Sequence, residues 1–200
     1  MPSSRLPTRI RILATLAALS CGRSGASQAP VLHDLAGGLL RFSAPSAWRI
    51  VNNDQGSERS TLIFEVPLPT GHTGRGNVIV TIFQGLGDGD LRSVTDPFVA
   101  ALVHGPVIAE TTLAAPDRRF LFWRGDRDGV PYVITDDFSW HSGLLVHVTM
   151  ALPLGSDVPE GWTRAFSSET EALLASVRLH DAPAFPGWAA HPRLSYIPAH

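Results

Sequence analysis

Residues 77–84 read NVIVTIFQ, and residues 143–152 read GLLVHVTMAL. Both stretches are rich in the β-branched residues that favour strands. The first is apolar on both of its alternating faces, which predicts a strand at the centre of a sheet with a covering layer on each side. The pattern argues against a sheet that has one face in water.

Other stretches with strand composition lie on both sides of residues 77–84. They predict strands at 39–42, 48–51, 60–66, 107–113, 118–124 and 131–140, with a polar turn at 52–57. GDRDG at 125–129 and HSG at 141–143 have the composition of hairpin turns. The later strands therefore follow one another as an antiparallel meander.

A first helix is predicted after the strand at 77–84. Asp90 is placed to cap a helix that begins at Leu91. Its apolar face carries Leu91, Val94, Phe98 and Leu102. Pro97 opposes a continuous helix, because an interior proline costs roughly 3 kcal/mol. A helix that starts near residues 95–96 therefore stays open as an alternative.

A second helix is predicted near the end of the domain. Pro159 suits its first turn. The apolar residues that follow recur near helical spacing, at Trp162, Phe166, Leu173, Leu174 and Val177. The whole order of elements indicates an α+β fold, in which an antiparallel sheet of about six to seven strands is covered by helices.

The chain has 200 residues, of which 44% are hydrophobic and 17% are charged. This length and composition indicate one globular domain. The formal net charge is −2, from 16 basic and 18 acidic residues. Such a balance provides no basic surface for nucleic acid or for an anionic membrane, so neither is expected as a partner.

Residues 1–26 resemble an export signal. Three arginines precede an uncharged apolar run at 12–20, which is too short to span a membrane. Cys21 is the only cysteine and follows this run directly, where a lipoprotein signal places the thiol that receives lipid. Ordinary cleavage after Ala26, with Ser24 as the other small residue, stays open as the alternative. Either product lacks a structural disulfide.

Residues 181–200 read DAPAFPGWAAHPRLSYIPAH, with four prolines and no hydrophobic period. This composition predicts a proline-rich tail without continuous regular structure. Its aromatic residues Phe185, Trp188 and Tyr196 suit an extended arm that packs across the domain. A loose tail that binds a partner is the alternative.

One cluster of residues has the types needed for nucleophilic or acid–base catalysis. It contains Asp136, Asp137, Ser139, His141 and Ser142 and lies at a predicted hairpin end, which favours a polar turn. The eight histidines show no metal-ligand spacing, and His147 is predicted to be a half-buried, hydrogen-bonded strand residue. We therefore predict no catalytic residue, no metal and no cofactor.

Two further sets of charged residues are candidate binding sites. Arg118, Arg119, Arg124 and Arg127 gather on one hairpin, where Asp117, Asp126 and Asp128 are expected to neutralise them as a solvated network. The loops GLGDGD at 85–90 and GDRDG at 125–129 offer paired aspartates but do not complete a calcium-binding loop. They are interpreted as turns.

The order of these elements resembles the PsbP-like family, which includes the Ran-binding Mog proteins and bacterial DcrB-type lipoproteins. The resemblance covers roughly residues 39–180. It lies in the entry FSAPSAW at 42–48, the strand NVIVTIF, the meander that ends GLLVHVTMALP, and the closing LLASVRL. It implies a single antiparallel domain between helices that acts as a binding or assembly module without a shared active site.

The expected function is that of a non-enzymatic exported protein of the cell envelope. It is expected in the periplasm, with a lipid anchor as its only membrane contact, and to bind an unknown envelope protein. The alternative from another class is an envelope hydrolase or metal-dependent enzyme that uses the region from Asp136 to His147. That alternative requires Asp136 or Asp137 within hydrogen-bond reach of His141 or His147 in a concave pocket.

Overall fold

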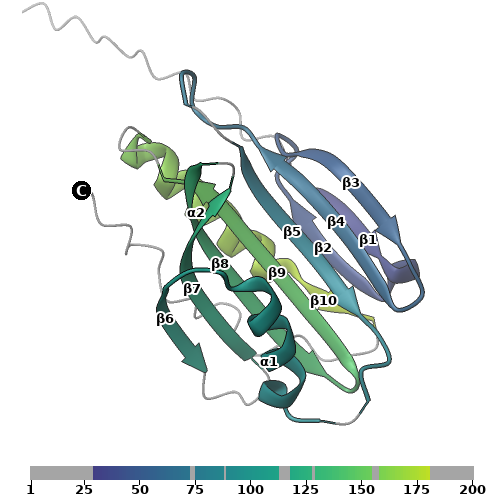
Figure 1. Cartoon of the computed structure of the whole chain (residues 1–200). Coiled ribbons are helices and arrows are strands. Elements are labelled where there is room, and N and C mark those ends of the chain that lie inside the picture. Colours follow the sequence, from purple (N-terminus) through teal and green to yellow (C-terminus); the bar gives the residue numbers. More distant parts are fainter. Residues whose placement is uncertain are drawn as a thin grey trace, which may run out of the picture.

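The structure, a computed structural model, describes residues 29–72, 75–87, 89–112, 118–127, 129–154 and 158–180. Its elements are shown in Figure 1. In chain order they are β1 (Val31–Leu35), η1 (Ala36–Gly38), β2 (Leu40–Ala44), β3 (Arg49–Gln55), β4 (Arg59–Val66), β5 (Gly76–Phe83), α1 (Leu91–Leu102), β6 (Val107–Thr112), β7 (Arg118–Arg127), β8 (Val130–His141), β9 (Leu144–Pro153), α2 (Glu160–Ser176) and β10 (Arg178–Leu179).

Seven strands form one antiparallel sheet in the order β3-β4-β5-β9-β8-β7-β6. Strands β6 to β9 are the predicted meander, and β9 then pairs with β5. The two stretches that predicted the sheet are therefore neighbours near its centre. The connection from β5 to β6 crosses to the far edge of the sheet and contains α1 (Figure 1).

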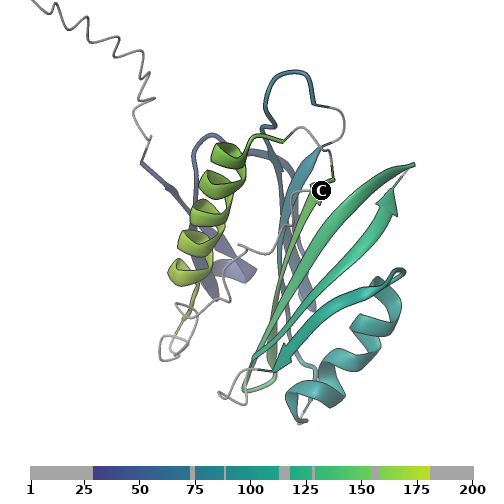
Figure 2. The same ribbon diagram turned by 90° about the vertical axis from the view of Figure 1, so that its left-hand side faces the viewer.

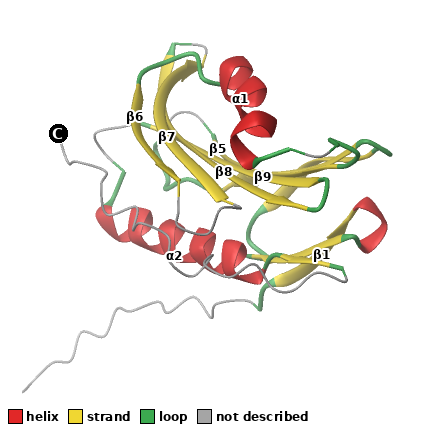
Figure 3. Cartoon of the chain, turned by 90° about the horizontal axis from the view of Figure 1, so that it is seen from below, coloured by secondary structure: helices red, strands yellow, loops and turns green. Residues whose placement is uncertain are grey.

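The large sheet is covered on both faces, as the two-sided apolar strand predicted. Helix α1 lies on one face, and α2 lies on the other (Figures 2 and 3). Strands β1, β2 and β10 form a second, three-stranded sheet on the α2 side. The α+β class and the antiparallel sheet between helices are thus confirmed.

The main core lies between β4, β5 and β9 of the large sheet and the layer of α2 and the small sheet. Phe64 is fully buried at its centre, in edge-on contact with Phe42 and Trp48. Phe166 of α2 packs against the Trp48 ring. Aromatic pairs of this kind stabilise a core beyond the area that they bury, so this cluster joins the two layers.

Helix α1 begins where the sequence predicts and runs without interruption through Pro97. The Asp90 side chain accepts a hydrogen bond of 2.8 Å from the Ser93 amide, which caps the first turn. Pro97 is exposed on the side away from the sheet, so the alternative of a later helix start is wrong. Leu102 was predicted on the buried face but is exposed at the last turn.

One predicted turn is wrong and two strands were not predicted, for one physical reason. The supposed turn at 52–57 is largely strand, because β3 continues through Gln55 and pairs with β4 as far as Ser60. Strands β1 and β10 were not predicted. All three segments are short or polar, and the hydrogen bonds that they make to neighbouring strands stabilise them, rather than their own composition.

Gly105, in the connection between α1 and β6, packs closely against the backbone of β7. A Cβ atom at this position would lie 1.9 Å from the Arg124 carbonyl oxygen. Only glycine permits that approach between two backbones. The amide of Arg124 donates to the Pro106 carbonyl oxygen at 3.1 Å, so the start of β6 is attached to β7 at this point.

Candidate functional site

The structure divides the predicted polar cluster between the two faces of the sheet. Asp136 lies on the α1 side, where it contacts Trp123 and His147. Asp137 and Ser139 alternate with it along β8 and therefore lie on the α2 side. Ser142 is in the two-residue turn after β8, with a φ of 48°. The five residues therefore do not form one site.

Asp136 instead joins three residues of neighbouring strands in a buried hydrogen-bonded cluster. Its Oδ1 atom lies 2.8 Å from His147 Nε2 and accepts a hydrogen bond of 2.7 Å from Thr149 Oγ1. Its Oδ2 atom accepts a hydrogen bond of 2.7 Å from Trp123 Nε1. Asp136 is 2% exposed and His147 is 7% exposed, so the partners replace water at both carboxylate oxygens.

The environment of Asp136 favours its ionised form. Burial on its own raises the pKa of Asp136, but the hydrogen bond and charge of His147 and the hydrogen bonds of Thr149 and Trp123 outweigh it. The net effect holds the pKa of this carboxyl below its usual value. Phe138 stacks on the His147 ring, with 4.2 Å between centroids and 7° between planes, which restrains the orientation of the imidazole.

The geometry differs from that of a catalytic triad. In a triad the carboxylate and the nucleophile use opposite nitrogens of the histidine. Here Asp136 Oδ1 and Thr149 Oγ1 both lie near Nε2, at 2.8 and 3.0 Å. The Thr149 hydroxyl donates its proton to the carboxylate, so the histidine cannot act as its base. The contact between Asp136 and His147 that the enzyme alternative requires is present, but its arrangement is that of a structural hydrogen bond.

A buried ion pair lies on the opposite face of the same strands. Arg118 Nε donates to Asp137 Oδ1 at 2.8 Å, and Arg118 Nη2 donates to Oδ2 in a bidentate pair. Arg118 is 3% exposed and Asp137 is fully buried. The prediction that this arginine belongs to a solvated hairpin network is therefore wrong.

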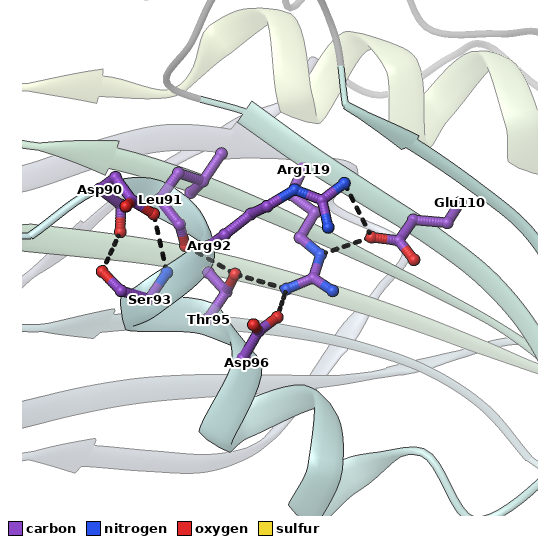
Figure 4. Close-up of polar contacts among 8 residues, drawn as sticks. All are labelled: Asp90, Leu91, Arg92, Ser93, Thr95, Asp96, Glu110 and Arg119. Atoms are coloured by element: carbon purple, nitrogen blue, oxygen red, sulfur yellow. Dashed lines mark hydrogen bonds and ion pairs between the residues drawn. The ribbon is translucent and has the colours of Figure 1, made fainter.

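Arg119 is also buried, and it connects α1 to the edge of the sheet (Figure 4). Its Nη1 atom donates to Thr95 Oγ1 at 2.8 Å and to Asp96 Oδ1 at 2.5 Å, both on α1. Its Nε atom donates to Glu110 Oε1 of β6 at 2.9 Å. Arg92 Nη2 lies 3.7 Å from the same oxygen. One guanidinium therefore holds α1, β6 and β7 together.

Among the described residues, the partners of Arg118 and Arg119 are not the aspartates expected to neutralise the arginines. Asp126 accepts a hydrogen bond from the Gly129 amide at 2.9 Å, as a turn residue does. Asp117 and Asp128 lie outside the described residues. The true partners of Arg119 are 9, 23 and 24 residues away, and only the crossing of α1 over the sheet brings them near.

A more accurate position for the hairpin turn between β8 and β9 would have predicted that Asp136 lies opposite Thr149. Residues 142 and 143 both have positive φ, which makes them a two-residue hairpin turn. That turn pairs His141 with Leu144 and Asp136 with Thr149. The predicted turn at 141–143 has three residues, whereas the observed turn at 142–143 has two. This difference changes the pairing of β8 with β9 by one residue, and such a change exchanges the faces of a strand.

The described residues contain neither a metal-binding group nor a helix that spans a membrane. Within the described ranges there is no group of three or more His, Cys, Asp or Glu side chains arranged to hold a metal ion. None of the helices in this part of the chain is both long and apolar enough to cross a membrane. Cys21, Ala26 and the tail at 181–200 lie outside the described residues.

Replacing the buried carboxylate by an amide is expected to lower the free energy of unfolding. We expect Asp136→Asn to lower the free energy of unfolding by roughly 3 kcal/mol above about pH 5. The substitution removes the negative charge that the buried Trp123, His147 and Thr149 side chains contact. Asp54→Asn, which alters an exposed ion pair with Arg59, is the control and should change stability little. Urea denaturation measures both. Equal stability of the two variants would contradict the role of Asp136.

The same variant has a defined pH dependence. The folded-state pKa of Asp136 is lowered, so its contribution to stability is fully present above its unfolded pKa of about 3.9. The contribution is lost as the pH falls through the folded pKa. The stability difference between the unaltered chain and Asp136→Asn should therefore shrink below about pH 4. A difference that grows on acidification would contradict the lowered pKa.

Arg119→Lys is expected to loosen α1 while leaving the charge unchanged. The planar Arg119 guanidinium donates hydrogen bonds to both α1 and β6, and a lysine ammonium cannot reproduce this arrangement. Each charged hydrogen bond that is lost costs about 1.5–3 kcal/mol. Hydrogen exchange should accelerate in α1 more than in β9. Arg164→Lys, an exposed pair with Glu160 on α2, is the control. Unchanged exchange in α1 would show that Arg119 does not hold the helix.

Neither a protein-family model nor a curated protein matches the sequence. Solved structures do match the fold. The Ran-binding protein Mog1p of Saccharomyces cerevisiae matches with a TM-score of 0.54 and 10% identity, over 76% of this chain and 95% of that one. A Mog1 variant, E65A, matches with a TM-score of 0.52 and 10% identity, over 76% and 96%. The chain therefore has the fold of the Mog1 proteins, which confirms, at the level of the fold, the resemblance to the family that includes them.

Proposed function

We propose that this protein is a non-enzymatic, exported binding module of the cell envelope, and that it binds an extended segment of another envelope protein along strand β6. The observation that carries the binding role is the exposed apolar edge formed by Val107 and Ile108, which we call the β6 edge. An unpaired edge strand presents a row of backbone donors and acceptors to which a partner strand can add.

The two edges of the large sheet differ in their chemistry. Strand β3, at the opposite edge, reads RIVNNDQ and is flanked by the exposed ion pairs Arg49–Glu65 and Arg59–Asp54. Charged side chains of this kind discourage pairing with another chain. Strand β6 begins Val-Ile-Ala, and its Glu110 is engaged by Arg119. Each edge exposes two apolar side chains, Ile50 and Val51 on β3 and Val107 and Ile108 on β6. The β6 edge is the less protected of the two because its acidic residue is bound to the buried Arg119.

The buried charges support a binding role over a catalytic one. The carboxylates of Asp136 and Asp137 and the guanidinium of Arg119 each have partners within the fold. They stabilise strands and α1, and an acid–base group needs access to a substrate. The fold of the Ran-binding protein Mog1p also serves protein binding, which supports the same class of function by analogy.

Export rests on the amino-terminal sequence. The basic residues before the apolar run at 12–20 and the position of Cys21 support either a lipid-anchored protein or a soluble periplasmic one cleaved after Ala26. A single acyl chain binds membranes only marginally, and stable anchoring needs more than one. The diacylglycerol that a lipoprotein signal directs to the cysteine carries two acyl chains. The lipidated form is therefore expected in the membrane fraction.

The intact mass of the protein recovered from its host tests export. We expect a chain that begins at Cys21 and carries lipid, with a Cys21→Ala variant that loses the lipid mass. A chain without lipid that begins at residue 27 supports export without an anchor. Recovery of a chain that retains residues 1–20 from the cytoplasmic fraction alone would overturn the export proposal.

Two matched substitutions test the β6 edge. Ile108 is 44% exposed and Val51 of β3 is 43% exposed, so a lysine at either position should leave the fold intact. Proteins cross-linked to the unaltered chain in intact cells are identified by mass spectrometry. We expect Ile108→Lys to lose the specific partner at least tenfold and Val51→Lys to retain it. Retention by both variants would contradict binding at the β6 edge.

A further inference from the structure

A second apolar cluster lies on the α2 side of the sheet, away from the main core. It consists of Phe120, Phe122 and Val133, and we call it the β7–β8 face. Phe122 is 8% exposed and Val133 is 7% exposed. Side chains so thoroughly removed from water need a layer of atoms above them.

The helix and small sheet on this side cover a different part of the large sheet. The core that α2 forms takes its large-sheet residues from β4, β5 and β9. In the described part of the chain, that core includes no side chain of β6, β7 or β8. Among the same residues, Leu154 is the single partly buried apolar side chain that packs on the β7–β8 face. Most of the cover must therefore come from outside the described ranges.

The β7–β8 face also holds polar atoms that lack partners. Thr135 and Ser139 lie on the same side of β8 as Val133, at 2% and 0% exposure. The hydroxyl oxygens of both are buried with no hydrogen-bond partner among the described residues. Buried hydroxyl groups are nearly always hydrogen-bonded. An irregular segment with free backbone amides and carbonyls would satisfy them, and a regular helix would not.

The carboxyl-terminal residues are the best candidate for this cover. Strand β10 pairs with β2, so the chain leaves the described fold at His180 on the α2 side of the large sheet. Twenty residues follow, and at about 3.3 Å per residue they can reach any point of that face. Four prolines exclude a continuous helix or central strand and leave backbone groups unpaired.

Aromatic content separates this segment from the others. Residues 181–200 contain Phe185, Trp188 and Tyr196, which bring large apolar surfaces. Residues 1–28 contain no aromatic side chain, and neither do the loops at 113–117 and 155–157. Among the segments outside the described ranges, only the carboxyl-terminal one can therefore cover Phe122 and Val133 with aromatic rings.

We propose that residues 181–200 bind in cis across the β7–β8 face as an extended arm, with aromatic side chains packed on Phe122 and Val133 and backbone groups bonded to Thr135 and Ser139. The arm covers the part of the α2 side of the large sheet that α2 and the small sheet leave uncovered. This assignment does not depend on export or on binding at the β6 edge.

Photo-crosslinking in the full-length protein tests the arm directly. A benzoylphenylalanine replaces Phe122, and the matched control replaces Phe98, an aromatic residue on the α1 face. After illumination at low protein concentration, we expect the probe at 122 to form intramolecular adducts with peptides from 181–200. The probe at 98 should form none with that segment. Adducts from 122 to residues 1–28, to a second copy or to no peptide would overturn the proposal.

A second variant shows whether the aromatic rings are responsible. Residues 181–200 are replaced by a Gly/Ser sequence of the same length, which removes the apolar contacts and keeps a flexible chain. We expect binding of a hydrophobic fluorescent dye to rise severalfold and the thermal midpoint to fall by several degrees. A synthetic peptide of residues 181–200 should reverse both changes, whereas one with Phe185→Ala and Trp188→Ala should not. Dye binding equal to that of the unaltered protein would overturn the proposal.

Discussion

Strands β7, β8 and β9 have buried residues on both faces, and the charged side chains on them therefore need partners inside the protein. A buried ion without a partner costs several kcal/mol, which is a large share of the stability of a domain of this size. Three groups meet this constraint: Asp136 with its three donors, Arg118 with Asp137, and Arg119 with α1 and β6. Much of the remaining architecture follows from these pairings.

The pairings also specify how the layers are placed. Asp136 reaches β7 and β9 at once, which restrains the register of the meander because a shifted strand would bury its carboxylate without donors. Arg119 places α1 over β7 and holds the Glu110 side chain of β6 on the α1 side of the sheet. The β6 edge is apolar and exposed, and the division between paired charges in the interior and this apolar edge is the basis of the proposed binding role.

Several features were predictable from sequence because the signal was local. The two-faced strand at 77–84 required cover on both sides, and the structure provides α1 on one face and α2 on the other. The cap at Asp90 was predicted from residue type and position. In contrast, β1 and β10 have little intrinsic strand preference, and Leu102 fits the helical period but lies beyond the sheet that would bury it. Periodicity reports which side of an element is apolar, and not how far its neighbour extends.

The amino-acid sequence by itself determined the fold class, the meander and the helix that caps at Asp90. Each depends on residues within one element or one turn. The tertiary structure alone decided which charges meet: Arg119 with Asp96 across 23 residues, Arg118 with Asp137 on one face of β8, and Asp136 with His147 on the other. The reason is physical, since strand register and the path of α1 set these distances, and a one-residue shift in either would exchange the faces and separate every pair.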